Sequence, residues 1–162
     1  MREHRTSAGD LIERLALKPH PEGGWYRELY RSRMRVAGAG GERAVLTTIY
    51  YLLERGQVSR WHVVAADEVW HFYHGDPLEL YGYDPESRVS TRQVLDRPTD
   101  GREPAAIMPA GVWQAARSLG DYSLVGCSVA PGFEFTDFRL IADLPHHDSH
   151  FAGPLKRLRD LL

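Results

Sequence analysis

The sequence predicts a single all-β domain, a barrel or sandwich, with one short helix at its N-terminus. About ten short segments rich in β-branched and aromatic residues recur at a spacing of roughly 8–12 residues, between turns that contain Gly or Pro. A length of 162 residues is typical of one domain, and no linker or repeat divides the chain. We expect one domain over residues 1–162, with a core at about 11–140 and a C-terminal tail at 141–162.

The N-terminal helix is expected to start at Ser7 or Asp10 and to run to Leu17. Either side chain can accept a hydrogen bond from the free N–H groups of the first helical turn. Pro19 and Pro21 then end the helix. A second short helix, of one or two amphipathic turns, is expected in the tail at Leu155–Leu162.

The strands follow from composition and from the turns between them. Ala44–Leu53 is long, β-branched and aromatic, which predicts a buried central strand. Val36–Glu42 before it is Gly-rich and is expected to be a flexible connection or a hairpin loop. The other predicted strands are Trp25–Ser32, Val58–Val64, Glu68–His74, Leu78–Tyr83, Arg88–Leu95, Ala105–Met108, Val112–Arg117, Tyr122–Ala130 and Phe133–Leu140.

Composition limits the classes of function. The 43% hydrophobic and 26% charged residues are ordinary for a globular protein, and a net charge of -2 offers no basic surface for nucleic acid. No apolar run reaches the ~18 residues that cross a bilayer. Residues 1–10 lack the apolar core of a signal peptide. The one cysteine, Cys127, can form no disulfide within the chain, so we expect a cytoplasmic protein with a buried structural thiol.

Two polar clusters are interpreted as solvent-exposed. The first is a basic run whose arginines mostly alternate, which is typical of one solvated face of a strand. Its members are Arg27, Arg31, Arg33 and Arg35. The second is a histidine-rich tract in the tail, interpreted as a polar tail rather than a metal site. Its histidines are His146, His147 and His150.

The stretch from residue 56 to 75 holds the best candidate site. His62 and Glu68 lie six residues apart, around a tight connection at Ala65–Asp67. Side chains alternate along a strand, so Trp70 and Phe72 share the face of Glu68. We expect His62 and Glu68 to lie on neighbouring strands and to face one interior, as the polar groups of a small-molecule pocket. Alternatively, they form a buried hydrogen-bonded pair that only satisfies the barrel interior.

Other polar residues are open to two interpretations. Glu22 lies between Pro21 and a Gly-Gly pair, so its carboxylate could cap backbone N–H groups or could be presented at the mouth of the barrel. His71 is expected to point outward, as an interface or packing residue. His74 has inward parity but lies beside a turn, at the rim or in a structural role.

These residues resemble the cupin superfamily. Its first motif is Gly, five residues, His, one residue, His, three or four residues, Glu, six residues, Gly. The chain matches it at Gly56, His62, Glu68 and Gly75, but Val64 replaces the second histidine. The second motif is Pro-x-Gly, two residues, His. Here Pro109-Ala110-Gly111-Val112-Trp113 leads to Gln114 in place of that histidine.

Within the superfamily the chain is similar to the cupin-five family, formerly a domain of unknown function. The resemblance runs from about Leu11 to about Leu140. It rests on His20–Glu28, Ser59–His62, Asp67–Phe72, Gly75–Leu78, Pro109–Gln114 and Val125–Phe133. It implies a cupin barrel (a double-stranded β-helix, or jelly roll), commonly a homodimer, and no settled activity.

The departures from the cupin motifs bear on metal binding. The resemblance implies three imidazoles and one carboxylate in cupins that bind iron, manganese, nickel or zinc. Valine at position 64 cannot ligate, and the amide oxygen of Gln114 is a weak donor for these metals. We therefore expect no tightly bound transition metal or other cofactor. His62, Glu68 and Gln114 are the weak candidate ligands.

The expected function is metal-independent acid–base chemistry, of the epimerase or isomerase type, on a small polar metabolite that is sugar-like or bears a carbonyl. His62 would be the general base, Glu68 would orient it or act as the second acid–base group, and Gln114 would donate to a substrate oxygen. The expected substrate contacts are completed by Glu22, Trp70 and Phe72. The alternatives are a non-catalytic sensor or carrier and a metal-dependent cupin with a reduced ligand set.

Overall fold

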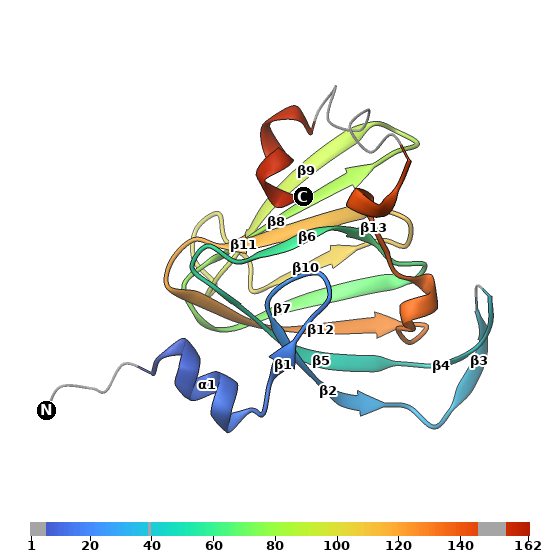
Figure 1. Cartoon of the computed structure of the whole chain (residues 1–162), viewed down its shortest axis with the longest axis horizontal. Helices are drawn as coiled ribbons and strands as arrows, with labels where there is room; N and C mark the ends of the chain where they lie inside the picture. Colours follow the sequence, from blue (N-terminus) through green and yellow to red (C-terminus); the bar gives the residue numbers. More distant parts are fainter. Residues whose placement is uncertain (1–5, 39, 146–154) are drawn as a thin grey trace, which may run out of the picture.

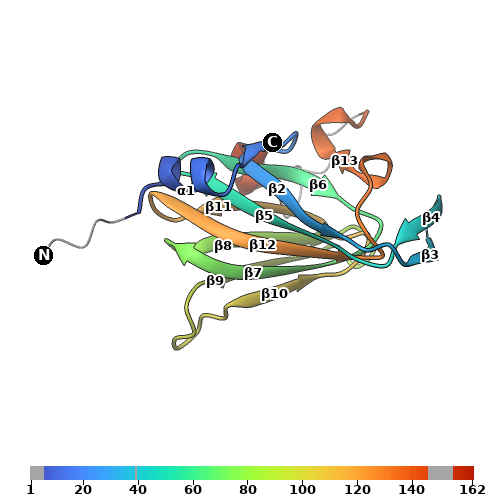
Figure 2. The ribbon, with the colours of Figure 1, turned by 90° about the horizontal axis from the view of Figure 1, so that it is seen from below.

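The computed structural model describes residues 6–38, 40–145 and 155–162, and these form two stacked antiparallel sheets that curve around one interior (Figures 1 and 2). The larger sheet has the order β1-β2-β5-β12-β7-β10 and the smaller one β13-β6-β11-β8-β9. The bounds of the larger sheet are β1 (Lys18–Pro19), β2 (Trp25–Arg31), β5 (Thr47–Glu54), β12 (Tyr122–Ala130), β7 (Asp67–Gly75) and β10 (Ala105–Met108). Those of the smaller sheet are β13 (Arg139–Leu140), β6 (Val58–Val63), β11 (Trp113–Ser118), β8 (Leu78–Asp84) and β9 (Val89–Leu95).

The remaining elements lie around the two sheets. Helix α1 (Ala8–Arg14) lies at one end of the barrel, and the hairpin of β3 (Arg35–Gly38) and β4 (Gly41–Ala44) projects at the other (Figures 1 and 2). In the described part of the chain after β12 lie three short 3₁₀ helices: η1 (Phe135–Asp137), η2 (Ile141–Asp143) and η4 (Lys156–Leu161). The predicted all-β barrel with a short N-terminal helix is therefore confirmed. No helix in the described part of the chain has the length and apolar character needed to cross a membrane.

The core is divided among three clusters of buried side chains. The largest lies between the sheets and includes Tyr51, Trp70, Phe72 and Leu80. A second covers the outer face of the smaller sheet, where the C-terminal residues pack on the strands; its members include Trp61, Val63, Trp113, Ile141, Leu155 and Leu161. A third packs α1 against β5 and β12. Strand β6 is thus covered on both faces, which explains why Trp61, His62 and Val63 are all buried.

The N-terminal helix starts where the sequence predicted but ends earlier. Ser7 and Asp10 form a reciprocal capping box, in which the Asp10 N–H donates to Ser7 Oγ at 3.2 Å and the Ser7 N–H donates to the Asp10 carboxylate at 3.0 Å. The helix ends at Arg14 rather than Leu17, because Ala16 takes a φ of 50° and turns the chain out of the helix.

The predicted strand Ala44–Leu53 is wrong in one respect, because it is two strands. Strand β4 ends at Ala44 and β5 begins at Thr47. The Ala44 carbonyl accepts from the N–H of Gly132 at 2.7 Å, so the chain there meets a loop rather than a continuing ladder. The Gly-rich stretch before it forms the β3–β4 hairpin, one of its two expected structures.

The predicted strand Phe133–Leu140 is also wrong. Its first part is the 3₁₀ turn η1, and only Arg139–Leu140 pair as a strand. Phe133, Phe135 and Phe138 pack on one another with ring centroids 4.9–6.2 Å apart instead of alternating between two faces. The other predicted strands agree with the structure to within one residue at each end. The tail histidines His146, His147 and His150 lie outside the described residues.

Candidate functional site

A cavity of about 230 Å³ opens between the two sheets. The larger sheet contributes residues of β1, β2, β5, β7 and β12, and the smaller sheet contributes His62 of β6. The polar lining residues are Lys18, His20, Glu22, Glu28, Arg31, Thr47, Tyr51, His62, Glu68 and Cys127. Apolar and aromatic side chains complete the wall: Tyr26, Ile49, Val64, Val129, Phe133 and Phe135. The volume lies below the ~300–1,000 Å³ typical of sites for drug-sized ligands, so it suits a small metabolite.

His62 and Glu68 both line this cavity, but not from neighbouring strands as predicted. His62 lies on β6 of the smaller sheet, and Glu68 lies on β7 of the larger sheet. Both are buried, at 2% and 7% exposure. The connection between them crosses from one sheet to the other. The Glu68 carboxyl nevertheless reaches the smaller sheet, because it accepts from Nε2 of Gln114, whose register partner on β6 is His62.

The loop that precedes β2 carries Glu22 into the cavity. The N–H of Arg60 donates to the Glu22 carbonyl at 2.9 Å, so the loop lies directly on β6. Gly23 has a φ of 113°, and a Cβ there would lie 2.1 Å from the carbonyl oxygen of Val58. Only glycine fits this contact. Of the two interpretations of Glu22, the structure shows presentation to the cavity: its carboxylate accepts from Ser59 Oγ at 2.8 Å and lines the cavity wall.

The contacts of His62 determine which ring nitrogen carries the proton when the ring is neutral. Nδ1 lies 2.8 Å from the carbonyl oxygen of Arg60. A carbonyl oxygen can only accept, so Nδ1 is the protonated nitrogen. Nε2 then holds the lone pair, and it lies 3.3 Å from Oε2 of Glu22. A proton taken up at Nε2 would therefore lie beside a carboxylate, which stabilises the imidazolium ion.

Glu68 differs from Glu22 in its surroundings. Burial raises the pKa of Glu68 from its ordinary value of 4.5 to about 7; His62 opposes this shift and the nearby Glu22 carboxylate adds to it. Glu68 also contacts the thiol of Cys127, which is buried as the sequence predicted and whose pKa is raised by burial and by Glu68. A pKa near 7 keeps Glu68 a carboxylic acid well above the pH at which an ordinary carboxyl group ionises.

Gln114 acts on Glu68 rather than on the cavity. Its Nε2 donates to Glu68 Oε2, and its Oε1 accepts from the indole N–H of Trp70 at 2.9 Å. An indole nitrogen only donates, which determines the orientation of the amide. Gln114 is fully buried and does not line the cavity. The expectation that it donates to a substrate oxygen is therefore corrected, because its donor is already engaged by Glu68.

The expected aromatic walls are also corrected. Trp70 and Phe72 do point to the same interior as Glu68, since all three are buried, but both belong to the core between the sheets and neither lines the cavity. Their places are taken by aromatic residues of β2, β5 and the segment after β12: Tyr26, Tyr51, Phe133 and Phe135. His71 is only partly buried, and His74 is exposed with its Nδ1 2.8 Å from the hydroxyl of Tyr122.

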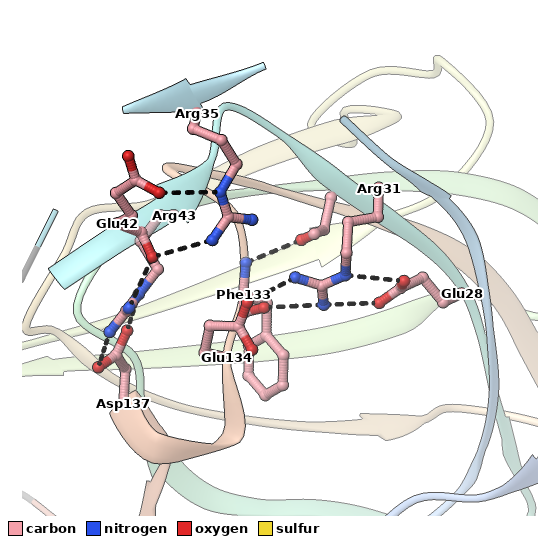
Figure 3. A network of polar contacts seen from close by, with 9 residues as sticks. Glu28, Arg31, Arg35, Glu42, Arg43, Phe133, Glu134 and Asp137 are labelled. Carbon is pink, nitrogen blue, oxygen red and sulfur yellow. Dashed lines mark hydrogen bonds and ion pairs between the residues drawn. The ribbon is translucent and has the colours of Figure 1, made fainter. Parts of the chain in front are cut away.

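A network of ion pairs holds the segment after β12 over the cavity (Figure 3). Arg31 of β2 contacts the carboxylates of Glu28 at 2.9 Å and Glu134 at 2.7 Å, and it donates to the carbonyl oxygen of Phe133 at 3.0 Å. Arg43 of β4 pairs with Asp137 at 2.8 Å. Arg31 lines the cavity, so the interpretation of the arginine run as one solvated face is wrong for this residue.

The donor set does not fit a transition metal of the cupin type. The amide oxygen of Gln114 is turned to Trp70 and cannot face a metal beside Glu68. Position 64 is valine, which cannot ligate a metal, so His62 is the one imidazole at the three histidine positions of the cupin motifs. Within residues 6–38, 40–145 and 155–162, no three His, Cys, Asp or Glu side chains are grouped as a metal site would require.

This donor set leads to a prediction about metal content. Protein purified, treated with a chelator at neutral pH and dialysed should hold well below one equivalent of iron, manganese, nickel or zinc, because one imidazole and one carboxylate make a weak site. Elemental analysis by mass spectrometry measures this directly. One equivalent of any of these metals that resists the chelator would contradict it.

Tyr51 supports the loop that carries Glu22. Its hydroxyl donates to the carbonyl oxygen of Gly23 at 2.7 Å, and burial together with the Glu22 carboxylate raises its pKa well above the usual value. Tyr51→Phe should destabilise the protein by about 1–2 kcal/mol, since the Gly23 carbonyl loses its buried partner. Tyr50→Phe is the matched control, because Tyr50 packs beside Tyr73 and Arg27 instead. Equal free energies of unfolding for the two variants in denaturant would show that the bond is unimportant.

Comparison with known proteins identifies the family of this chain. The model of the family described as Cupin superfamily (DUF985) matches residues 9–141. The chain belongs to this family. A crystal structure of a Shewanella oneidensis protein is 37% identical, with a TM-score of 0.80, and covers 91% of this chain and 94% of that one. A hypothetical protein from Leishmania major is 31% identical, with a TM-score of 0.81, over 96% of this chain and 97% of that one.

More distant structures share only the cupin fold. A variant of Bacillus subtilis oxalate decarboxylase is 12% identical, with a TM-score of 0.58, over 89% of this chain and 37% of that one. A dTDP sugar isomerase from Desulfovibrio desulfuricans is 13% identical, with a TM-score of 0.52, over 71% and 82%. A search of proteins with curated functions gave no match.

Proposed function

We propose that this cupin is a metal-independent isomerase or epimerase that moves a proton on a small, polar metabolite bearing a carbonyl, such as a simple sugar. The observation that carries the proposal is the pairing of two acid–base groups of opposite character in one cavity. His62 with Glu22 and Glu68, with a pKa of about 7, line the same cavity. An imidazole and a carboxyl group with a pKa near neutrality in one cavity are typical of proton-transfer enzymes.

The first step is proton removal from the carbon next to the carbonyl. Nε2 of His62 takes the proton, and the electron pair of the C–H bond moves to the carbonyl oxygen to give an enediolate. The imidazolium ion that forms on His62 is held by the Arg60 carbonyl at Nδ1 and by the Glu22 carboxylate beside Nε2. Ser59 donates to the other oxygen of Glu22 and fixes its position.

The second step is proton return to carbon. Glu68 is a carboxylic acid below about pH 7 and can give its proton to the enediolate. Return to the opposite face of the same carbon inverts its configuration. Return to the neighbouring carbon moves the carbonyl, with transfer of that carbon's hydroxyl proton to the former carbonyl oxygen. Exchange with solvent then returns the proton of His62 and reprotonates Glu68. Gln114 keeps the Glu68 carboxyl in place throughout. The cavity wall of aromatic side chains limits the access of water.

The distant relatives bear on this proposal only through their fold. The dTDP sugar isomerase demonstrates that a cupin barrel can house sugar isomerisation, which is an analogy of scaffold and not of residues. We further propose, from the sequence, that the chain is a cytoplasmic homodimer that binds neither nucleic acid nor membranes.

The test is exchange of carbon-bound hydrogen with solvent. The protein is incubated in D₂O with D-glyceraldehyde, dihydroxyacetone and simple aldoses, and loss of the proton next to the carbonyl is followed by NMR. We expect catalysed exchange with at least one of these probes, because proton removal from carbon is the step that every version of the mechanism shares.

The matched control is Glu86→Gln, which changes an exposed carboxyl in the turn between β8 and β9. Its rate should equal that of the wild type, while Glu68→Gln should lose product formation. Binding of the probes without any exchange would instead indicate a sensor or carrier and would contradict the proposal.

A further inference from the structure

His20 lines the cavity and has no role in the mechanism above. It lies in the loop between β1 and β2, two residues before Glu22, with a side chain only 6% exposed. Its ring packs edge-on against Tyr26 at 4.5 Å between centroids, and it also contacts Phe135 at 5.9 Å. These contacts hold the plane of the imidazole in one orientation.

The backbone determines the tautomer of His20. The N–H of Glu22 donates to Nδ1 at 3.2 Å, so Nδ1 holds a lone pair and carries no proton. The Glu22 carboxylate is farther from Nδ1, at 3.7 Å, and does not replace the amide as partner. Burial lowers the pKa of His20, which keeps the ring neutral. A neutral imidazole with a bare Nδ1 carries its proton on Nε2.

No acceptor for the Nε2–H group of His20 occurs among the described residues. In the described part of the chain, every fully buried side-chain nitrogen or oxygen has a hydrogen-bond partner. Nε2 of His20 has none, so it is not fully buried. We infer that it is exposed to the cavity, because the ring of His20 lines that cavity. The site therefore holds one donor that the protein itself does not use.

We propose that His20 is a further catalytic residue, which donates Nε2–H to the carbonyl oxygen of the ligand and stabilises the negative charge that develops there. This inference rests on the proposed proton transfer and narrows its substrates to small compounds with a carbonyl beside a hydroxyl-bearing carbon. His62 and His20 then have opposite tautomers and opposite tasks: His62 presents a lone pair at Nε2, and His20 presents a proton. Proton removal next to a carbonyl requires both.

The test combines NMR of the full chain with two substitutions at one position. Long-range ¹H–¹⁵N spectra of labelled protein at neutral pH should show His20 as the Nε2–H tautomer and His62 as the Nδ1–H tautomer. Dihydroxyacetone should shift the Nε2 resonance of His20, whereas propane-1,3-diol, which lacks the carbonyl, should not. His20→Phe should slow exchange about a hundredfold, as the loss of one oxyanion donor does, and His20→Gln should retain most of the rate because its amide can donate from a similar place.

The outcomes separate this inference from the proposed function. His20→Phe removes the acceptor of the Glu22 N–H, whereas Oε1 of glutamine can still accept from it, so the free energies of unfolding of both variants are measured beside their rates. Equal rates in the two variants would overturn the inference. An Nδ1–H tautomer or an imidazolium ion at His20 would also overturn it. If dihydroxyacetone shifts the Nε2 resonance but no hydrogen exchange occurs, the donor role of His20 is supported and the isomerase is refuted. If exchange occurs without the resonance shift, the isomerase is supported and the donor role is refuted. If neither the shift nor exchange is seen, both proposals are refuted.

Discussion

His62→Gln should slow exchange of the substrate proton with solvent by about a thousandfold, the middle of the range for a lost general base. An amide cannot take up a proton at neutral pH, although it fills nearly the same space between Arg60 and Glu22. The measurement is the NMR exchange rate at saturating probe, on a variant whose thermal unfolding matches that of the wild type. The affinity for the probe should change much less than the rate.

His71→Gln is the control for this substitution. It replaces a histidine of β7 that does not line the cavity, so exchange should continue at the wild-type rate. An unchanged rate in His62→Gln would contradict the assignment of the base. A loss of probe binding with no change in rate would show that His62 only holds the ligand.

Glu68→Gln should make the protein less sensitive to alkaline pH. The pKa of Glu68 is about 7 in the folded protein and 4.5 for a free glutamate, as in the unfolded chain, so well below pH 4.5 the carboxyl is protonated in both states and its contribution to stability is complete. As the pH rises through 7, the unfolded state releases the proton first and this contribution is lost, by about 3 kcal/mol in total. Glutamine cannot ionise and shows no such loss.

Denaturant unfolding at a series of pH values measures this effect. Between pH 4 and pH 8 the free energy of unfolding of Glu68→Gln should rise by about 3 kcal/mol relative to the wild type. Glu86→Gln, at an exposed carboxyl, should follow the wild type throughout. A wild type whose stability relative to Glu68→Gln increases with pH would have the opposite sign and would show that Glu68 is ionised in the folded protein.

Most of the fold could be predicted because strand signals are local. Alternation and turn residues placed the ends of β10 and β12 correctly. The segment Phe133–Leu140 was mispredicted, because its aromatic residues look like a strand but pack on one another at the cavity. The division after Ala44 depends on its bond to Gly132, a contact between residues far apart in the sequence. The local sequence pattern therefore predicts neither the turn after β12 nor the break between β4 and β5.

The site was predictable to the extent that motif spacing determines it. His62, Glu68 and Glu22 all line the cavity, as expected from the cupin-like spacing and from the glycines after Glu22. The alternation of side chains along β7 predicts that Trp70 points into the barrel. It does not predict how far along the barrel axis Trp70 lies, and the structure places this residue in the core and not at the cavity.

Several residues of the cavity were missed, among them Arg31 and His20. Arg31 looked like one member of a solvated run, and only its pairing with Glu134, more than a hundred residues away, brings it to the cavity. For His20 the sequence indicates no role beyond membership of a family motif. Its position two residues before Glu22, in a Pro- and Gly-constrained loop, was the available signal. Its tautomer depends on one backbone hydrogen bond and could not be inferred from sequence.

The most direct test of metal-independent proton transfer between His62 and Glu68 compares exchange by metal-stripped and metal-supplemented protein. Both samples come from one preparation, with metal content measured beside the D₂O assay. The arrangement of Gln114, Val64 and Glu22 predicts equal exchange rates in the two samples. Exchange that disappears in the stripped sample and returns with one equivalent of iron, manganese, nickel or zinc would contradict this mechanism.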